Sequence, residues 1–455
     1  MKIRGTLSGN AINWKEFAPA LIVAANSLIW YTVLYAMFNS AVTQLPLKPI
    51  ESDEIFGAFY VAIAFSAVIG GELFPRARKT GLALWMVFGA ATSILMITMA
   101  TNQFYINILY SILLGASIGI GLPSALAFFA DSTHIEKRGF QGGLTWSIVG
   151  IGILALGTVL TLTETAIGLT LLSVWRLIGL SFLLLLLKCQ QINPPTQPNQ
   201  SYRQILGQRE LILYLMPWIM FSLINFTELP IWTNDFKSVF PSFVAYQGFI
   251  EFAITGVFAF IGGFLADRIG RKKIVMAGFV VLGVEYAVLS LFGKYAVSWY
   301  LFTGFDGAAW GLFAAVFFMT LWGDLAREGK KEKYYILGGL PYLLAGFLTI
   351  AIQNATTSTA NLTSMSFSLA SFFLFIAVLP LVYAPETLPD KAVKDRELKT
   401  YLEKAQQIAK KEAEKKQWNG NSGSTNEVTS KSKEEKEKKQ KDLEDEARKL
   451  AEKYY

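Results

Sequence analysis

The sequence predicts an all-α polytopic membrane protein with twelve transmembrane helices in two pseudo-symmetric six-helix bundles, followed by a charged helical C-terminal tail. Three observations predict this class. The 455 residues are 53% hydrophobic and only 16% charged, well below the roughly one quarter of charged residues in soluble domains. Apolar runs of about 20 residues, each enough to cross a hydrocarbon core of about 30 Å, recur along most of the chain. The two halves of this apolar region also resemble each other.

Charged residues, Pro or Gly, and Asn or Ser clusters mark the ends of the apolar runs. The predicted crossings of the first half cover residues 18–42, 54–75, 81–101, 104–130, 141–162 and 167–188. Those of the second half cover residues 211–232, 243–266, 273–292, 297–323, 334–354 and 366–384. We therefore expect an N-terminal bundle at 1–188, a cytoplasmic linker at 189–209, a C-terminal bundle at 210–390 and a cytoplasmic tail at 391–455.

Lysine and arginine gather in alternate loops of this predicted topology. With the N-terminus inside, the outer loops hold only Lys48, Lys237 and Lys294, while the inner loops hold the basic clusters. Because cytoplasmic loops carry the excess of Lys and Arg, both termini are predicted to be cytoplasmic. The expected location is the cell membrane, crossed many times.

A sequence repeat relates the two halves. The stretch from Gly263 to Lys273 has a degraded copy from Gly71 to Lys79. Asp131 and Asp324 likewise correspond, at the ends of the fourth and tenth predicted crossings. A duplication with six crossings per half is typical of transporters built from parallel repeats about an axis along the membrane normal. Such a plan predicts a cavity between the halves.

The charged stretch between the eighth and ninth predicted crossings carries a family resemblance. It fits the pattern G-x-L-A-D-R-x-G-R-K at every fixed position, with Gly263, Leu265, Ala266, Asp267, Arg268, Gly270, Arg271 and Lys272. This signature resembles the loop motif of the major facilitator superfamily (MFS) of transporters. With softer likenesses in the fourth crossing and at Ala384 to Thr387, the resemblance covers residues 1 to about 390.

The resemblance implies two bundles that rock about a central site and carry a small solute by alternating access. It also implies a cytoplasmic latch that includes Asp267 and Arg268, with Asp324 as an ion-pair partner. A carboxylate near a helix N-terminus and an arginine near a helix C-terminus are both favoured.

The first-half copy of this latch departs from the family pattern. Pro75 and Arg78 stand where the family has Asp and Gly, so we retain only Arg76 and Asp131 as latch residues there. The fifth crossing lacks the Gly-Pro motif of antiporters in the family, which disfavours drug efflux. The seventh lacks the glutamines of its sugar porters, so specificity for sugars does not follow.

Carboxyl groups inside predicted crossings are candidates for transport, because a charge in the bilayer costs a few kcal/mol on insertion scales. Asp306 shares a helix face with Trp310 and is a candidate substrate or proton site; the alternative is an interhelical hydrogen bond. Glu251 lies with Gln247 on a polar stripe and is the second candidate proton carrier, against a structural role, since poor solvation eases protonation of a carboxyl group. Glu228, nearer the outer end of its crossing, is expected at a gate or a solvated rim.

Two other charges in predicted crossings receive a structural interpretation. Glu285 lies near the middle of the ninth crossing, where we expect a hydrogen bond to a neighbouring helix. Arg176 is expected either in mid-membrane or extended towards the outer surface.

Polar and aromatic side chains recur every four residues along the first and seventh crossings. Aromatic rings with hydroxyl or amide partners suit small polar solutes, so we interpret these positions as a substrate cavity, with helix packing as the alternative. The cavity candidates are Asn26, Trp30, Tyr31, Tyr35, Trp218, Ser222, Asn225, Gln247 and Trp310.

No catalytic chemistry is predicted. The sequence has one cysteine and one histidine, and it shows no Ser/His/Asp set, paired metal ligands or phosphate-binding glycine loop. We therefore expect no enzyme activity, cofactor, metal site or nucleic-acid partner. The tail has nearly balanced charges and helical apolar spacing. It is expected to be a solubilising extension or an arm that docks an unknown partner.

The leading interpretation is a secondary active transporter of a small organic solute, such as a sugar or an organic acid, with proton-coupled uptake. Its expected partners are the solute, the lipid bilayer and protons. Two alternatives stay open. One is an exporter or uncoupled facilitator of the same fold, and the other is a transporter-like receptor or scaffold that acts through its tail.

Overall fold

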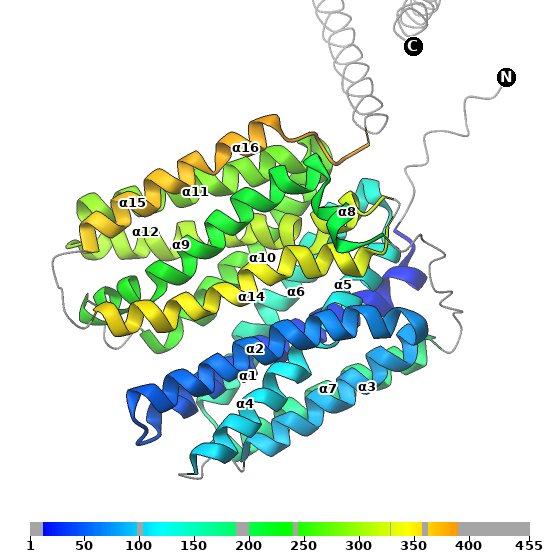
Figure 1. Ribbon diagram of the computed structural model, residues 1–455, viewed down its shortest axis with the longest axis horizontal. Coiled ribbons are helices and arrows are strands. Elements are labelled where there is room, and N and C mark those ends of the chain that lie inside the picture. The colour runs from blue at the N-terminus through cyan, green and yellow to red at the C-terminus, as the bar shows by residue number, and fades with distance from the viewer. Residues whose placement is uncertain are drawn as a thin grey trace, which may run out of the picture. The chain divides into compact units, whose positions relative to one another are not determined.

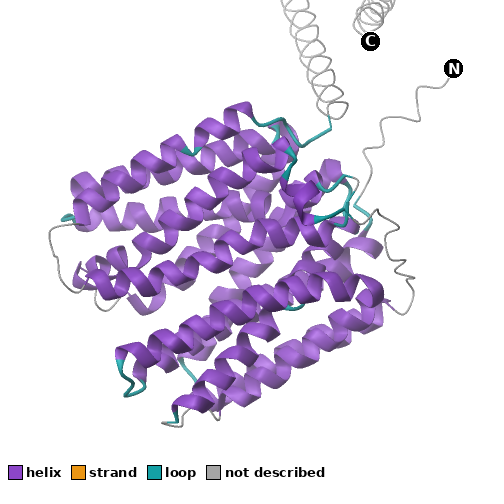
Figure 2. Cartoon of the chain, in the orientation of Figure 1, coloured by secondary structure: helices purple, strands orange, loops and turns teal. Residues whose placement is uncertain are grey.

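The computed structural model describes residues 12–97, 103–187, 200–239, 244–327, 329–356 and 363–389. Within these ranges the secondary structure is helical, and Figure 2 shows helices joined by loops with no strand among the described residues. The predicted all-α class is therefore confirmed for this part of the chain. The tail at 391–455 and most of the linker at 189–209 lie outside the described residues, so both stay predictions.

Helices in the first half follow the predicted crossings to within a few residues. They are α1 (Trp14–Gln44), α2 (Pro49–Leu73), the 3-10 turn η2 (Phe74–Ala77), α3 (Arg78–Leu95), α4 (Phe104–Gly119), α5 (Leu122–Asp131), the 3-10 turn η4 (Ile135–Lys137), α6 (Arg138–Thr161) and α7 (Thr165–Leu187).

The second half begins with a short helix and continues with long ones. Its elements are α8 (Tyr202–Leu206), α9 (Arg209–Val239), α10 (Val244–Ile269), α11 (Arg271–Phe292), α12 (Ala296–Phe313), the π-helical segment η5 (Ala314–Leu321), α13 (Trp322–Leu325), α14 (Lys331–Thr356), α15 (Thr363–Ile376) and α16 (Val378–Tyr383).

Two predicted crossings contain an interruption that hydropathy does not reveal. The fourth is divided into α4 and α5, because Pro123 has no N–H to donate to the preceding turn. The tenth continues from α12 into η5, where the Thr320 hydroxyl donates a 2.6 Å hydrogen bond to the carbonyl oxygen of Ala315. Such π segments inside α-helices are frequent at functional sites.

Eleven stretches of the described chain are long and apolar enough to cross a membrane. One of them, Pro49–Leu95, has 47 residues and contains both α2 and α3. At 1.5 Å per residue it would extend about 70 Å, more than twice a hydrocarbon core, and the chain bends back between the two helices (Figure 1). The protein is thus a multi-pass membrane protein, while the total of twelve crossings stays a prediction.

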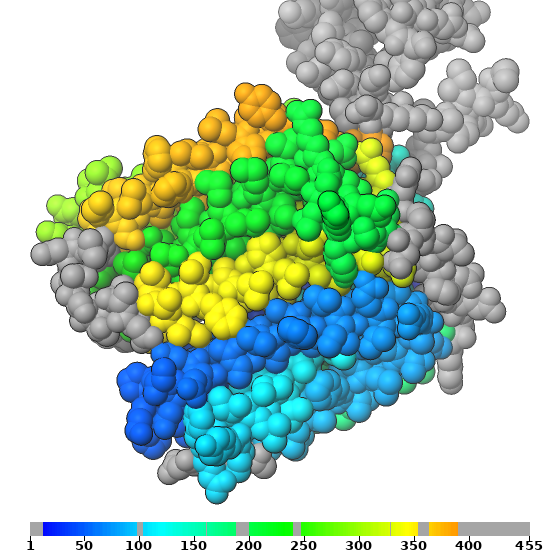
Figure 3. Space-filling view, in the orientation of Figure 1, coloured from blue at the N-terminus to red at the C-terminus, as the bar shows by residue number. Residues whose placement is uncertain are grey.

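Two helix pairs make the largest contacts between the first half and the second. The contact of α6 with α10 is the most extensive between any two elements. Glycine makes it possible, because a Cβ atom at Gly143 or Gly150 would collide with the backbone carbonyl oxygens of Ala259 or Phe252. The other pair is α2 and α14, whose surfaces meet in Figure 3.

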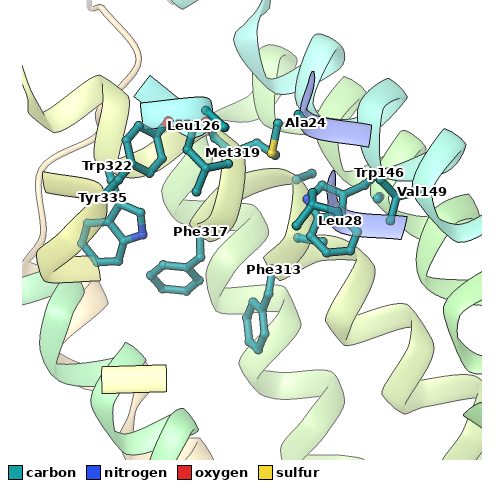
Figure 4. Close-up of a cluster of buried hydrophobic side chains, with 14 of the residues drawn as sticks. Ala24, Leu28, Leu126, Trp146, Val149, Phe313, Phe317, Met319, Trp322 and Tyr335 are labelled. Carbon is teal, nitrogen blue, oxygen red and sulfur yellow. Dashed lines mark hydrogen bonds between the residues drawn. The ribbon is translucent and has the colours of Figure 1, made fainter. Parts of the chain in front are cut away.

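A cluster of buried apolar side chains fills the space between the halves (Figure 4). The first half contributes Ala24, Leu28, Leu126, Trp146 and Val149, and the second half contributes Phe313, Phe317, Met319, Trp322 and Tyr335. We call these ten residues the central apolar cluster.

Candidate functional site

A cavity of about 340 Å³ lies between the halves, bounded by α1, α6, α9 and α10. We call it the inter-half cavity. Its polar lining side chains are Thr32, Asn39, Thr233, Lys237 and Gln247. Four aromatic rings complete much of the wall, from Trp232, Phe236, Phe249 and Phe252. A site of this composition can contact both polar and apolar parts of a small molecule.

The inter-half cavity lies towards one end of the helices, and a cluster of charged residues lies at the other. On α10, Gln247 at the cavity precedes Asp267 at the charged end by 20 residues, which is a rise of about 30 Å. Along α6 the order is Arg138 at the charged end, Trp146 in the central apolar cluster and Ile153 at the cavity. The central apolar cluster therefore separates the cavity from the charged end.

Behind the cavity wall lies a pair of carboxyl groups. Nε2 of Gln247 donates a 2.6 Å hydrogen bond to Oε2 of Glu251. Glu251 and Asp306 lie within hydrogen-bonding reach of each other, and the Trp310 indole is within reach of Asp306. An ionised carboxylate can only accept hydrogen bonds, so a bond between two carboxyl groups requires one of them to hold a proton.

This pair has no basic counterpart. Within the described ranges, no lysine or arginine forms an ion pair with Glu251 or Asp306. No group of His, Cys, Asp and Glu in that part of the chain could hold a metal ion. Because two adjacent carboxylates repel each other, the pair is suited to taking up and releasing one proton.

Glu228 and Glu285 lie away from the cavity wall. Glu228 is 4% exposed and accepts a 2.6 Å hydrogen bond from Ser366 of α15, so it does not lie at a solvated rim, while a gate role stays a prediction. Glu285 is 1% exposed, and neither of its oxygens has a hydrogen-bond partner among the described residues. The expected hydrogen bond of Glu285 is therefore not formed within the described residues, and Ser371 on the facing helix α15 donates to the Gly283 carbonyl oxygen.

Asn26 and Trp30, predicted to line a cavity, face the interior of the first half. Asn26 donates to the carbonyl oxygen of Trp175 at 2.7 Å and accepts from Nη1 of Arg176 at 3.0 Å. Trp30 donates to the Ser93 hydroxyl at 2.8 Å. The cavity interpretation of these two residues is therefore wrong for this structure, since α3 and α7 occupy the space that they face.

Arg176 is fully buried between two tryptophans. Its guanidinium carbon lies 4.5 Å from the ring centroid of Trp30 and 4.8 Å from that of Trp85. Nη1 also donates to the Ser27 hydroxyl at 2.6 Å. Arg176 therefore does not extend to the outer surface but joins α1, α3 and α7 from within.

The remaining cavity candidates divide between packing and the space between the halves. Tyr35 shares a 3.0 Å hydrogen bond with Tyr60, and the Tyr31 ring lies 6.1 Å from that of Tyr35. Trp218 donates to the Gly338 carbonyl oxygen at 2.6 Å and stacks on a phenylalanine ring of η5, and Ser222 donates to the Trp218 carbonyl oxygen. These contacts fit the packing alternative for Trp218 and Ser222.

Among the predicted cavity residues, Gln247 lines the inter-half cavity. Trp310 lies next to Asp306, and Asn225 is half-buried on α9. Lys237 and Phe249 also line the cavity, although the sequence pattern does not predict them as cavity residues. Lys237 was identifiable as one of three lysines in predicted outer loops, whereas nothing in the spacing distinguishes Phe249 from the lipid-facing rings of α10.

At the charged end, Asp267 caps a helix of the other half. Its two carboxylate oxygens accept hydrogen bonds from the backbone N–H groups of Gly139 and Phe140, at 3.0 and 2.7 Å. These donors belong to the first turn of α6, where a negative charge is favoured. Gly263 allows this approach, because a Cβ atom there would collide with the Gly139 carbonyl oxygen.

Asp324 lies at the centre of the charged end. It is fully buried and pairs with Arg138 of the first half and, at 3.0 Å, with Arg271 of the second. Arg271 also pairs with Asp267 at 3.0 Å. Arg268 is not the partner of Asp324, because it lies on the exposed face of α10 with its guanidinium 4.0 Å from the Phe264 ring.

A second set of ion pairs involves the first-half copy of the motif. Asp131 pairs with Arg78 at 2.7 Å and also with Lys331, while Arg78 pairs with Glu332. Arg78, and not the expected Arg76, is the buried partner of Asp131, since the η2 turn leaves Arg76 exposed. Two of these pairs, Arg78 with Glu332 and Lys331 with Asp131, join the two halves.

The end of the second half supports the start of α11. Gly270 has φ +106°, a conformation that favours glycine. The Glu386 carboxylate accepts hydrogen bonds from the backbone N–H groups of Arg271 and Lys272, at 2.9 and 3.3 Å. Nζ of Lys272 donates to the carbonyl oxygens of Val382 and Ala384. The loop motif and the chain ending thus form one structural unit.

The fold of this chain is similar to the folds of several solved transporter structures. The chain is similar to the MFS proton:xylose symporter XylE bound to 6-bromo-6-deoxy-D-glucose, with 13% identity, coverage of 83% of this chain and 97% of that chain, and a TM-score of 0.64. It is also similar to the human organic anion transporter MFSD10 (TETRAN), at 14% identity, 82% and 100% coverage and a TM-score of 0.62. A third similar structure is the MFS transporter FucP in the outward conformation, at 12% identity, 82% and 99% coverage and a TM-score of 0.60.

No protein-family model and no curated protein matches the sequence. The family resemblance therefore depends on the loop motif at Gly263 to Lys272 and on the fold. These agree, because the motif lies between two spanning helices of the second half in a structure that aligns along more than four fifths of the chain. The chain has the fold of the MFS transporters.

Proposed function

We propose that this protein is a secondary active transporter that moves a small organic solute by alternating access and couples the movement to protons. The observation that carries the proposal is the carboxyl pair of Glu251 and Asp306, joined through Gln247 to the inter-half cavity. Two transporters of similar fold are named as a proton:xylose symporter and an organic anion transporter.

The charged end supports alternating access. The two halves are joined by the Asp267 carboxylate of α10 at the first turn of α6, by the Arg138–Asp324 pair and by the Arg78–Glu332 pair. These contacts and the central apolar cluster close one end, while the cavity lies towards the other. The closed end is the one that the distribution of lysine and arginine assigns to the cytoplasm. Opening it requires these ion pairs to separate.

The carboxyl pair supports the proposed proton coupling. A proton from water in the cavity binds to the ionised member of the pair, and it leaves when the opposite end opens. Charge inside the membrane is costly, so the neutralised pair moves more easily through the occluded state.

The first experiment measures the protonation of the carboxyl pair in the absence of a solute. Infrared spectroscopy of the purified protein should show a protonated carboxyl band that titrates with pH and is lost or shifted in Asp306→Asn and Glu251→Gln. The exposed Glu16→Gln is the control. A band that is identical in wild type and both variants would contradict the proton role.

The second experiment measures flux. Proteoliposomes with an inward pH gradient should accumulate one member of a panel of sugars and carboxylates, and Asp306→Asn should abolish accumulation while sparing exchange of solute. Equal flux with and without the gradient would favour the uncoupled facilitator, and accumulation only in the reverse direction would favour the exporter.

A further inference from the structure

We infer that the inter-half cavity binds a small organic anion with a ring-sized apolar body, and that Lys237 is its counter-ion. The inference deepens the proposed transport function, on which it rests, by naming the chemical class of the solute.

Charge is the first argument. Among the described residues that line the cavity, Lys237 is the charged one and none is a carboxylate. Within the described ranges Lys237 forms no ion pair, so its ammonium group is free to meet a ligand. An ammonium group in a concave, partly apolar site attracts an anion more strongly than one on a flat, hydrated surface.

The polar neighbours favour an oxygen anion. Asn39 lies across the cavity on α1 and Gln247 lies on α10, and both carry amide N–H donors. Thr32 adds a hydroxyl group, while the Thr233 hydroxyl already donates a 2.6 Å hydrogen bond to the Leu229 carbonyl oxygen. A carboxylate, with two oxygens that only accept hydrogen bonds, can use an ammonium group and these donors together.

The apolar wall of the cavity indicates the second part of the ligand, which is its apolar body. Trp232 and Phe236 come from α9, and Phe249 and Phe252 come from α10. Their rings offer stacking and edge contacts to a planar or cyclic body. The volume, about 340 Å³, lies at the small end of the usual range of about 300–1,000 Å³ for ligand sites, which favours a single ring over a large amphiphile.

The position of Gln247 indicates which way the ligand is oriented. Its anionic group should point towards the amide of Gln247, and so towards the carboxyl pair. Nε2 of Gln247 already donates to Glu251, and the same side chain lines the cavity. An anion that competes for this amide acts directly on the hydrogen bonding of the carboxyl pair. Solute binding and proton binding would then be coupled through one side chain.

The test is calorimetric titration of the purified full-length protein with four matched probes: benzoate, its neutral isostere benzamide, the cation benzylammonium, and acetate, which lacks the ring. Benzoate should bind at least about tenfold more tightly than each of the others. Lys237→Gln should abolish this preference and Lys237→Arg should keep it. Lys294→Gln, at another predicted outer lysine, is the matched control and should bind like wild type.

Several results would overturn the inference: equal affinity for benzoate and benzamide, tighter binding of benzylammonium, or the same effect in Lys237→Gln and Lys294→Gln. The two proposals fail separately. Lys237-dependent benzoate binding without gradient-driven flux would sink the proton-coupled function alone. Gradient-driven accumulation of a neutral solute without benzoate binding would sink the anion site alone.

Discussion

Gln247 and Glu251 lie one helical turn apart on α10, and the amide of the first donates a 2.6 Å hydrogen bond to the carboxyl group of the second. Gln247 therefore contacts the cavity and the carboxyl pair at once. A side chain in this position can transmit the presence of a solute to the proposed proton site with no movement of the backbone.

Replacing Gln247 by Leu should uncouple solute from proton. The variant keeps the shape of the helix but removes the donor, and a hydrogen bond to a charged group is worth about 1.5–3 kcal/mol. We expect gradient-driven accumulation to fall by about tenfold or more while exchange persists, as measured in proteoliposomes with a trapped pH dye. Thr255→Val, one turn beyond Glu251 on the same stripe, is the control. Unchanged coupling in the Gln247 variant would refute this role.

Arg176 should tolerate Met better than Lys. The arginine is fully buried between two tryptophan rings, and within the described ranges it has no carboxylate partner. Lysine keeps the buried charge but cannot stack its compact ammonium group on both rings, whereas methionine removes the charge and fills the space. The thermal unfolding midpoint in detergent should therefore be lower for Arg176→Lys than for Arg176→Met. The reverse order would show that the charge itself is required.

Asp324→Asn should open the charged end. The substitution leaves Arg138 and Arg271 without their shared carboxylate, and breaking a buried ion pair costs about 3–5 kcal/mol. A cysteine introduced at Leu126 in the central apolar cluster, in a background with Cys189→Ser, should then react faster with a thiol reagent. Arg268→Gln is the matched control, because that arginine is exposed and should leave labelling unchanged. Similar rates in the two variants would argue against the assigned ion pairs.

Gly150→Ala should destabilise the protein through the α6–α10 contact. The new Cβ atom would collide with the Phe252 carbonyl oxygen, and overpacking of this kind costs about 1–3 kcal/mol. Gly339→Ala on α14 has open space around the added methyl and should keep or raise the unfolding midpoint. The comparison is made by thermal unfolding of both variants. A stable Gly150→Ala variant would mean that the two helices can separate freely.

Helix bounds were predictable because the length and polarity of a spanning helix are set by the bilayer, which acts on every crossing alike. The breaks at Pro123 and in η5 were not, since hydropathy averages over such local changes in hydrogen bonding.

Side-chain partners were harder to predict. A four-residue repeat identifies a helix face but not the neighbour that the face meets, so the repeat predicts a cavity at Asn26 and Trp30 although they face α7 and α3. At the charged end the motif contains Asp267 and the family resemblance implies Asp324, but neither indicates which arginine reaches each of them. Some of the paired residues come from opposite halves of the chain, and no local sequence pattern predicts such pairs. They include Arg138, Arg78 and Glu332.

The π-helical segment η5 has a consequence for the two acidic residues on either side of it. In an unbroken α-helix, Asp306 and Asp324 would be related by five whole turns, because 18 residues separate them, and they would point the same way. The wider turns of η5 offset this phase, so Asp306 can meet Glu251 while Asp324 meets arginines of both halves. A change of one residue in the winding of η5 would rotate one carboxylate by about 100° against the other. The tenth crossing thus sets the relative angle of its two acidic residues by the pitch of a single short segment.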